Sequence, residues 1–186
     1  LLAQTYAIDN IGAPCQTVRI YLERASGGVS GGTLASFTEL FEAASTDPVA
    51  RQTLQNPYSL APSGERNGVD PGQQRLARKD PLTGEWTAPS PMAPVNERVV
   101  RRSNALLEYP YGREFHCSEV IPTGRSVAGA AGSTLIAGGF GLFSAAMSIA
   151  PIRYVMSRFV FPAPGEGPSE QQIAAGYFTV RVLGRG

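Results

Sequence analysis

The 186-residue chain has a formal net charge of +1 and only 17% charged residues, so its composition offers no basic surface for nucleic acid. Its length leaves room for one domain, residues 1–186, with a sizeable hydrophobic core. One histidine and two cysteines, Cys15 and Cys117, are too few for the ligands of a metal site, so we expect none. The two cysteines fit a reducing, intracellular compartment.

The first elements are a helical segment and a strand. Leu1 to Ile8 follows a helical pattern, which Asn10-Ile-Gly-Ala-Pro14 interrupts. From Thr17 to Glu23 apolar and polar residues alternate, which predicts a half-buried strand. Its predicted inner face carries Val18, Ile20 and Leu22.

A glycine-rich turn over residues 27–33 follows this strand and precedes a helix predicted over residues 33–45. We expect this helix to pack against the sheet, with Phe37 on its apolar face. Free N–H groups at a helix N-terminus bind anions. The candidate residues for an anion or substrate are Ser30, Gly31, Gly32 and Thr33. The turn matches neither the Gly-x-Gly-x-x-Gly nor the Walker pattern, and a tight turn that packs the helix on its strand is the alternative.

The next segments are a short helix and a long loop. Thr46-Asp47-Pro48 predicts the start of a helix that ends near Asn56-Pro57. Residues 58–94 hold Pro, Gly and charges with little periodicity, which indicates a surface loop with a functional or partner-binding role. Trp86 lies in it, either as a lid or interface anchor or packed on the domain surface.

Regular structure is predicted again from Val95 to Tyr109, and a strand is predicted over Phe115 to Ile121. A run of hydrogen-bond donors in the first segment gives four more candidate substrate- or anion-binding residues: Arg101, Arg102, Ser103 and Asn104. His116 and Cys117 are adjacent on the strand and therefore point to opposite faces, which argues against a metal or nucleophile site. We assign no catalytic residue.

Residues 126–152 contain no charged residue and are long enough to cross a bilayer. Small residues recur every fourth position from Gly129 to Ala145, a spacing that lets helices approach closely. Contact with a membrane, contact with a partner subunit and burial in the protein's own core all remain open. The predicted membrane or partner contacts are Leu135, Ile136, Phe140, Leu142, Phe143 and Met147.

The last part of the chain alternates between apolar and turn-forming segments. Ile152 to Phe161 is amphipathic, with Arg153 and Arg158 on its flank. Ser169 is expected to cap a short helix. Tyr177 to Leu183 reads as a final strand whose predicted buried side carries Phe178, Val180 and Val182. The fold class expected is therefore α/β: a mixed sheet packed by helices, with one long apolar Gly/Ala-rich helix.

Several short blocks together resemble the saccharopine dehydrogenase-like oxidoreductases, a broad family that includes the trans-acting enoyl reductases and proteins of lipid bodies and mitochondria. No single block is diagnostic, but their order covers nearly the whole chain. They are Ser30-Gly-Gly-Thr33 with Ser36, Asp47-Pro48, Asn56-Pro-Tyr58, Val100 to Leu106, Tyr111-Gly112, the strand ending at Glu119, Gly165 to Ser169, Phe178-Thr179 and Gly184-Arg-Gly186.

The resemblance implies a two-part protein, with an N-terminal Rossmann domain for NAD(P) and a second domain for substrate binding and self-association. This chain resembles only the second part and has no Gly-x-Gly-x-x-Gly fingerprint. We therefore expect no cofactor in this chain itself.

Two functions remain open. The preferred interpretation is a non-catalytic, membrane-associated accessory subunit of an intracellular organelle membrane or lipid body, with a membrane, a membrane-protein complex or a second copy as partner. The alternative is the substrate or dimerisation domain of an NAD(P)-dependent reductase that acts on a lipid-like substrate.

Overall fold

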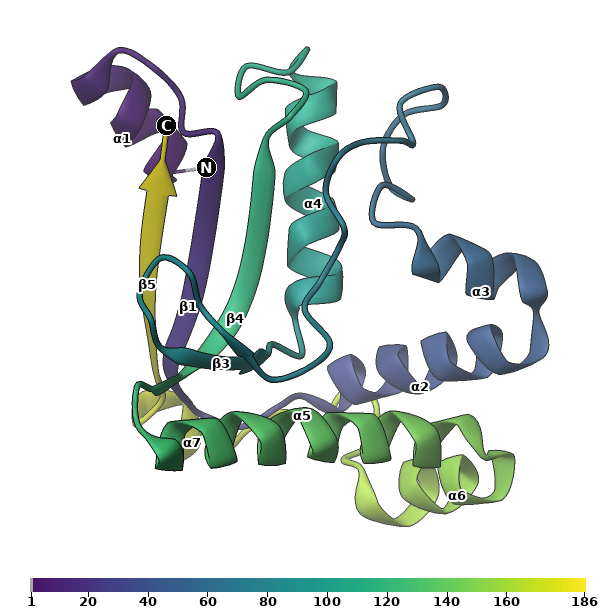
Figure 1. Cartoon of the computed structure of the whole chain (residues 1–186). Coiled ribbons are helices and arrows are strands. Elements are labelled where there is room, and N and C mark those ends of the chain that lie inside the picture. The colour runs from purple at the N-terminus through teal and green to yellow at the C-terminus, as the bar shows by residue number, and fades with distance from the viewer. Residues whose placement is uncertain (1) are drawn as a thin grey trace. The chain divides into compact units, whose positions relative to one another are not determined.

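The computed structural model describes residues 2–186, so Leu1, the first residue of the predicted N-terminal helix, lies outside the described residues. The α/β class is confirmed, because a mixed five-stranded sheet is packed with helices (Figure 1). Internal contacts divide the chain into two compact units. The first unit comprises Leu1–Glu23, Gln55–Ala137 and Val180–Gly186, and the second comprises Arg24–Leu54 and Gly138–Thr179.

The sheet has the strand order β2-β3-β4-β1-β5. Its central strands β1 (Thr17–Ser26) and β4 (His116–Gly124) are parallel, with Thr17 opposite His116. Strands β3 (Trp86–Pro89) and β2 (Arg78–Lys79) add in antiparallel fashion beyond β4, and β5 (Tyr177–Arg185) lies beside β1.

The helices begin close to where the sequence places them. Ser30 accepts a hydrogen bond from the Thr33 N–H at the start of α2, and Ser169 forms a capping box with Gln172 at the start of α7. The helices are α1 (Leu2–Ile11), α2 (Gly31–Thr46), α3 (Pro48–Gln55), α4 (Ala93–Leu106), α5 (Val127–Ser148), α6 (Ala150–Val155), the π-helix η1 (Met156–Val160) and α7 (Glu170–Ala174).

The segment 58–94, expected as a loop, contributes two strands to the sheet. Trp86 begins β3 and pairs with Gly124 of β4, so it is part of the sheet rather than of a free lid. Local periodicity could not indicate this, because β2 and β3 are too short to show alternation.

The helix that packs on the sheet is α4, which contacts β4. We expected α2 in that role, but the main contacts of α2 are with η1 in the second unit, and Phe37 is only half-buried. The hydrophobic cluster between α4 and the sheet consists of Val18, Tyr111, Phe115 and Cys117. The Tyr111 and Phe115 rings meet edge to face, with centroids 5.4 Å apart.

Strand β1 is covered on both faces, whereas the sequence predicted a half-buried strand. Val18 lies in the hydrophobic cluster, and Tyr21, on the opposite face, is fully buried. The Tyr21 hydroxyl donates to Asp80 over 3.1 Å. Burial first, and then the Asp80 carboxylate, raise the pKa of Tyr21 to about 12. A polar partner in the loop before β3 therefore allows a tyrosine to fill the face predicted to be exposed.

The inner face of β5 was predicted wrongly. Phe178, Val180 and Val182 are exposed, and Arg181 points toward the protein instead. The Arg181 guanidinium lies 4.6 Å from the centre of the Tyr21 ring, and it pairs with Glu23 at 2.8 Å and Glu85 at 2.7 Å. An arginine that stacks on an aromatic ring and pairs with two carboxylates takes the place of an apolar inner residue.

The apolar run forms the predicted long helix. By length and composition alone α5 could cross a membrane. Only 17% of its most apolar 18-residue stretch is buried inside the protein. Gly129 and Ser133 of the small-residue stripe are buried, but Gly141 and Ala145 are exposed. An α-helix has about 3.6 residues per turn, so a strict four-residue spacing drifts by about 40° at each step. The stripe therefore leaves the buried side along the second half of the helix.

Gly129 fits against backbone rather than against another helix. A Cβ atom at Gly129 would lie 2.6 Å from the Gly124 carbonyl oxygen at the end of β4. The Thr123 hydroxyl also donates to the Gly129 carbonyl over 2.8 Å. The N-terminal half of α5 is thus fixed to the end of the sheet.

Replacing Gly31 with alanine is expected to lower the free energy of unfolding by about 1–3 kcal/mol, because the new methyl group overpacks a closed contact. The Cβ atom would lie 2.0 Å from the Ala163 carbonyl oxygen. Gly32→Ala is the matched control, since a Cβ atom there would meet nothing within 4 Å. Chemical denaturation of both variants tests the prediction, and equal stabilities would contradict it.

Candidate functional site

A buried charge network lies between α4 and the loop that joins α3 to β2. The Arg101 guanidinium donates to Asp70 through Nε at 2.9 Å and Nη2 at 2.7 Å, and Nη2 also donates to Glu97 at 2.9 Å. All three side chains are almost completely buried. The polar face of α4, Glu97, Arg101 and Asn104, is therefore its inner face, while Val99 and Leu106 are exposed.

Glu97 connects this network to β4. One of its carboxylate oxygens accepts the N–H of Glu119 over 2.9 Å, while the other accepts from Arg101. The Glu119 carboxylate in turn accepts from Asn96 at 2.7 Å and from the Ser90 hydroxyl. Burial raises the pKa of Glu97 above its ordinary value, and these hydrogen bonds oppose the shift. The α4–β4 contact thus depends on paired carboxylates.

Asp70 brings the loop to the network. Its Oδ1 accepts the N–H of Gly72 over 3.0 Å, which closes a turn, and lies 3.7 Å from the His116 Nε2 atom. The Asp70 N–H donates to the hydroxyl oxygen of Tyr58 over 3.0 Å. One residue therefore fixes a tyrosine, an arginine of α4 and the beginning of β4 relative to one another.

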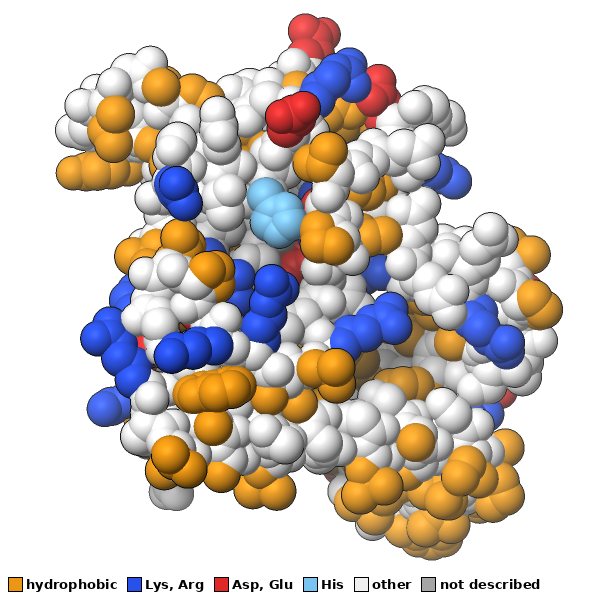
Figure 2. All heavy atoms as spheres, in the orientation of Figure 1, with side chains coloured by type: hydrophobic (Ala, Val, Ile, Leu, Met, Phe, Trp, Pro, Cys, Tyr) orange, Lys and Arg blue, Asp and Glu red, His pale blue; other side chains and the backbone are white. Residues whose placement is uncertain are grey.

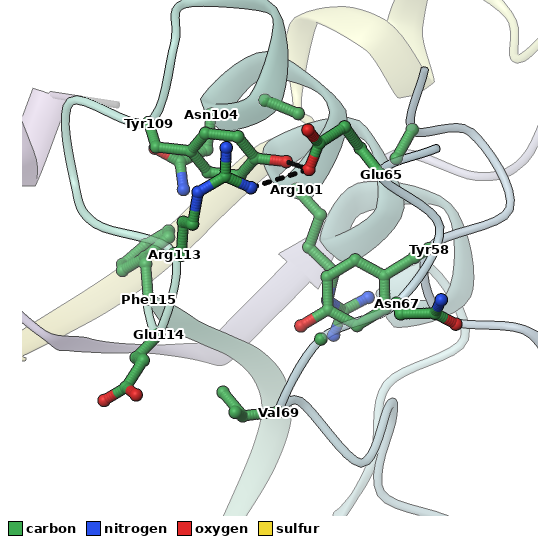
Figure 3. Close-up of a pocket in the computed structure, with 13 residues that line it drawn as sticks. Tyr58, Glu65, Asn67, Val69, Arg101, Asn104, Tyr109, Arg113, Glu114 and Phe115 are labelled. Atoms are coloured by element: carbon green, nitrogen blue, oxygen red, sulfur yellow. Dashed lines mark hydrogen bonds and ion pairs between the residues drawn. The ribbon is translucent and has the colours of Figure 1, made fainter. Parts of the chain in front are cut away.

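A cavity of about 240 Å³ opens beside this network, entirely within the first unit (Figure 3). Aromatic and aliphatic side chains line much of it, together with a few charged groups. The lining residues are Tyr58, Ala61, Glu65, Asn67, Gly68, Val69, Arg101, Asn104, Ala105, Tyr109, Arg113, Glu114 and Phe115.

A second charged group closes one side of the cavity. The Glu65 carboxylate accepts from the Tyr109 hydroxyl at 2.6 Å and from Arg113 at 2.7 Å, and Figure 3 shows the three side chains converging. The Arg113 guanidinium also lies 4.1 Å from the centre of the Tyr109 ring. Hydrogen bonds from Arg113 and then Tyr109 lower the pKa of Glu65. Glu65 is therefore ionised at neutral pH and forms an ion pair with Arg113.

Tyr58 presents the hydroxyl group of most chemical interest. Its oxygen accepts the Asp70 N–H, and within residues 2–186 the structure gives its own proton no acceptor. Its ring lies against Gly68, where a Cβ atom would be 2.3 Å from the ring carbon that carries the hydroxyl. The Arg101 guanidinium lies 5.6 Å from the ring centre. Burial raises the pKa of Tyr58, so the hydroxyl stays protonated and can donate into the cavity.

The donors predicted on α4 have divided roles. Arg101 and Asn104 line the cavity, although Arg101 is already paired with two carboxylates. Asn104 donates to the Gly112 carbonyl at 2.9 Å and accepts from the Tyr111 N–H. Arg102 is exposed and donates to the Leu60 carbonyl, and the Ser103 hydroxyl bonds back to Val99.

The predicted anion turn lies in the second unit, whereas the α4 donors belong to the first. Ser30 caps α2 together with Thr33, while Gly32 is exposed. The Gly31 N–H donates to the Glu166 carbonyl over 2.8 Å. The contact of Gly31 with Ala163 and this hydrogen bond favour the tight-turn alternative. The turn does not fit a dinucleotide pyrophosphate, which needs free N–H groups.

Sequence reasoning missed Tyr58, Gly68 and Asp70, because they lie in a segment without periodicity. The signal was present in Asn56-Pro57-Tyr58, since Asn56 accepts the Tyr58 N–H over 2.8 Å and forms a local turn. Within residues 2–186 there is no group of three or more His, Cys, Asp or Glu residues arranged to hold a metal.

The chain is similar to proteins named trans-acting enoyl reductase. It is 42% identical over 172 residues, 84% of its length, to a Mycobacterium tuberculosis protein whose name includes the words trans-acting enoyl reductase. It is 36% identical over 92% of its length to proteins named trans-acting enoyl reductase from Mycobacterium bovis and Mycobacterium ulcerans. These alignments span 39–43% of the relatives, so the chain covers less than half of their length. No family model and no solved structure matches the chain.

These relatives correct one interpretation. We preferred a non-catalytic accessory subunit because of the missing dinucleotide fingerprint, the long apolar run and the absence of a catalytic group of residues. The names of its relatives point to a reductase role instead, which fits the alternative, a portion of a reductase, better. The missing fingerprint describes only this chain and is no evidence about the longer proteins to which it is similar.

Replacing Arg101 with methionine is expected to lower the free energy of unfolding by about 3–5 kcal/mol, because it leaves Asp70 and Glu97 buried without a counter-ion. Arg102→Met is the control, because Arg102 is exposed one position along the same helix, and its replacement is expected to change stability by less than about 1 kcal/mol. Urea denaturation measures both. Similar losses in the two variants would show that the buried network contributes no more to stability than an exposed arginine does.

The two thiols are expected to differ in reactivity. Cys117 is almost fully buried, and burial raises the pKa of its thiol to about 12, whereas Cys15 is half-buried. Iodoacetamide should therefore modify Cys15 in the folded chain and leave Cys117 unmodified at neutral and mildly alkaline pH. Peptide mass mapping locates the label, and denaturant should expose Cys117. Modification of Cys117 in the folded chain would contradict the burial described.

Proposed function

We propose that this chain is the substrate-binding part of an NAD(P)-dependent enoyl reductase that acts on a lipid-like acyl substrate. The observation that carries the proposal is the similarity of 84–92% of the chain to proteins named trans-acting enoyl reductase. The resemblance of several sequence blocks to saccharopine dehydrogenase-like oxidoreductases favours the same assignment. Nicotinamide binding is assigned to a part of the enzyme other than the residues of this chain.

The cavity suits one end of an enoyl substrate. Its volume of about 240 Å³ is below the roughly 300–1,000 Å³ of pockets that hold a whole drug-sized ligand, so it receives part of a substrate. Phe115, Val69 and Ala105 provide apolar walls for hydrocarbon. The hydroxyl of Tyr58 provides a donor for a carbonyl oxygen.

The role of Tyr58 follows from the chemistry of conjugated carbonyl groups. When the double bond of an enoyl group is reduced, negative charge develops on the neighbouring carbonyl oxygen. A positioned hydroxyl that donates to this oxygen stabilises the charge. Tyr58 is suited to this role because Asp70 and Gly68 fix its position and its raised pKa keeps it protonated. We assign it as the group that orients the carbonyl.

The test is binding of an α,β-unsaturated acyl thioester of N-acetylcysteamine, measured by isothermal titration calorimetry. We expect saturable binding, which Tyr58→Phe weakens by about 3- to 10-fold through loss of one hydrogen bond. Tyr6→Phe is the control, because Tyr6 is an exposed tyrosine of α1. Gly68→Ala should weaken binding as well, since it displaces the Tyr58 ring.

Two results would overturn the assignment. Absence of saturable binding by the wild-type chain would remove the cavity as a substrate site. Equal binding by the Tyr58→Phe and Tyr6→Phe variants would leave the cavity in place and remove the role of Tyr58. Circular dichroism of each variant checks that the fold is retained.

A further inference from the structure

The second unit exposes a group of apolar side chains that its fold does not use. Figure 2 shows apolar side chains gathered over α6, at the lower right of the view. We call this surface the apolar cap, which consists of the exposed residues Ile149, Ile152, Tyr154, Val155, Phe159 and Val160. Tyr154 is 65% exposed and Phe159 is 74% exposed. Contiguous apolar surface of this kind marks an interaction site rather than ordinary protein surface.

The turn that carries the cap is held by buried groups instead. Arg153 is buried and donates to the carbonyl of Met147 over 2.9 Å, which satisfies an acceptor in the last turn of α5. Met147 is itself fully buried, and the N–H of Phe161 closes η1 on the carbonyl of Met156. Because these contacts define the turn, the cap side chains are available for an external partner.

The charge pattern indicates which partner fits. Between Arg125 and Glu166 the chain has no acidic residue, and its two cations there are Arg153 and Arg158. Arg153 is buried, whereas Arg158 is exposed beside Phe159. The exposed carboxylates Glu39 and Glu42 belong to α2, the helix that contacts η1, and not to the cap, where Arg158 is the exposed charge. An apolar surface with aromatic residues and an adjacent arginine fits the interface of an anionic bilayer.

We propose that the apolar cap docks the protein onto the surface of an anionic phospholipid bilayer, with Phe159 and Tyr154 inserted at the level of the headgroups. The helix α5 is not assigned as a span. Gly129 and Ser133 in its first half are buried, and Gly129 packs against the end of β4. A spanning helix would give up these contacts, whereas a docked cap keeps them. The bilayer contact is therefore interfacial.

Vesicle flotation tests the proposal with the chain alone, with phosphatidylcholine vesicles, and with vesicles that also contain phosphatidylglycerol. We expect the chain to float with the anionic vesicles. Phe159→Ser should lower the bound fraction roughly tenfold, because one aromatic side chain no longer leaves water. Arg158→Gln should weaken binding only to the anionic vesicles, by roughly fivefold, which is the contribution of one cation near such a surface.

Phe178→Ser is the matched control. Phe178 is 69% exposed, close to the exposure of Phe159, but it lies on β5 outside the cap. Flotation of this variant should equal that of the wild type. Thermal unfolding of all variants checks that the fold is retained, which is expected because both phenylalanines are exposed.

Three results would overturn the proposal. The first is that the wild-type chain floats with neither kind of vesicle. The second is that the Phe159→Ser and Phe178→Ser variants bind equally well. In the third, light scattering shows a dimer that Phe159→Ser converts to a monomer, and the cap is then a contact between two copies. None of these results depends on substrate binding at Tyr58, so failure here leaves the reductase assignment intact.

Discussion

The buried ion pair between Arg101 and Asp70 is the interaction on which the first unit depends. It joins a loop without regular structure to α4, and Glu97 joins the same helix to β4. Charges taken out of water are tolerated only when they are paired and hydrogen-bonded, so the network admits few other arrangements of these segments. The same network positions Tyr58, because the Asp70 N–H donates to its hydroxyl oxygen. The shape of the cavity follows from the same few contacts.

The elements were predictable from the sequence, because their signals are local. Alternation from Thr17 to Glu23 predicted β1, and Ser169 marked the start of α7. The buried face of each element was less predictable, since predictions from periodicity assume that apolar side chains point inward. Arg181 and Tyr21 break this assumption because they stack on each other and find carboxylate partners far away in the sequence. Similar long-range pairing makes the polar face of α4 its buried face.

The candidate site was predictable only in part, for the same reason. Arg101 and Asn104 stood out as donors, but nothing local indicated that Arg101 would be neutralised by Asp70, thirty-one positions earlier. Tyr58 and Gly68 lie in a segment whose periodicity carries no information. A residue without a Cβ atom is needed at Gly68, where the Tyr58 ring meets the backbone, but the local sequence did not indicate this contact. The apolar run correctly predicted the helix α5, but the small-residue stripe did not predict which side of this helix is buried.

The two units distribute polarity in opposite ways, and this bears on function. The first buries charges that fix one arrangement of the groups around Tyr58, which is what the role proposed for Tyr58 would require. The second exposes aromatic residues on α6 and η1 that do not hold the turn, since Arg153 and Met147 do so. The substrate proposed for Tyr58 is lipid-like, and a protein docked on a bilayer would lie where such substrates are dissolved. No residue of the apolar cap lines the cavity, so docking through the cap would leave the groups around Tyr58 unchanged.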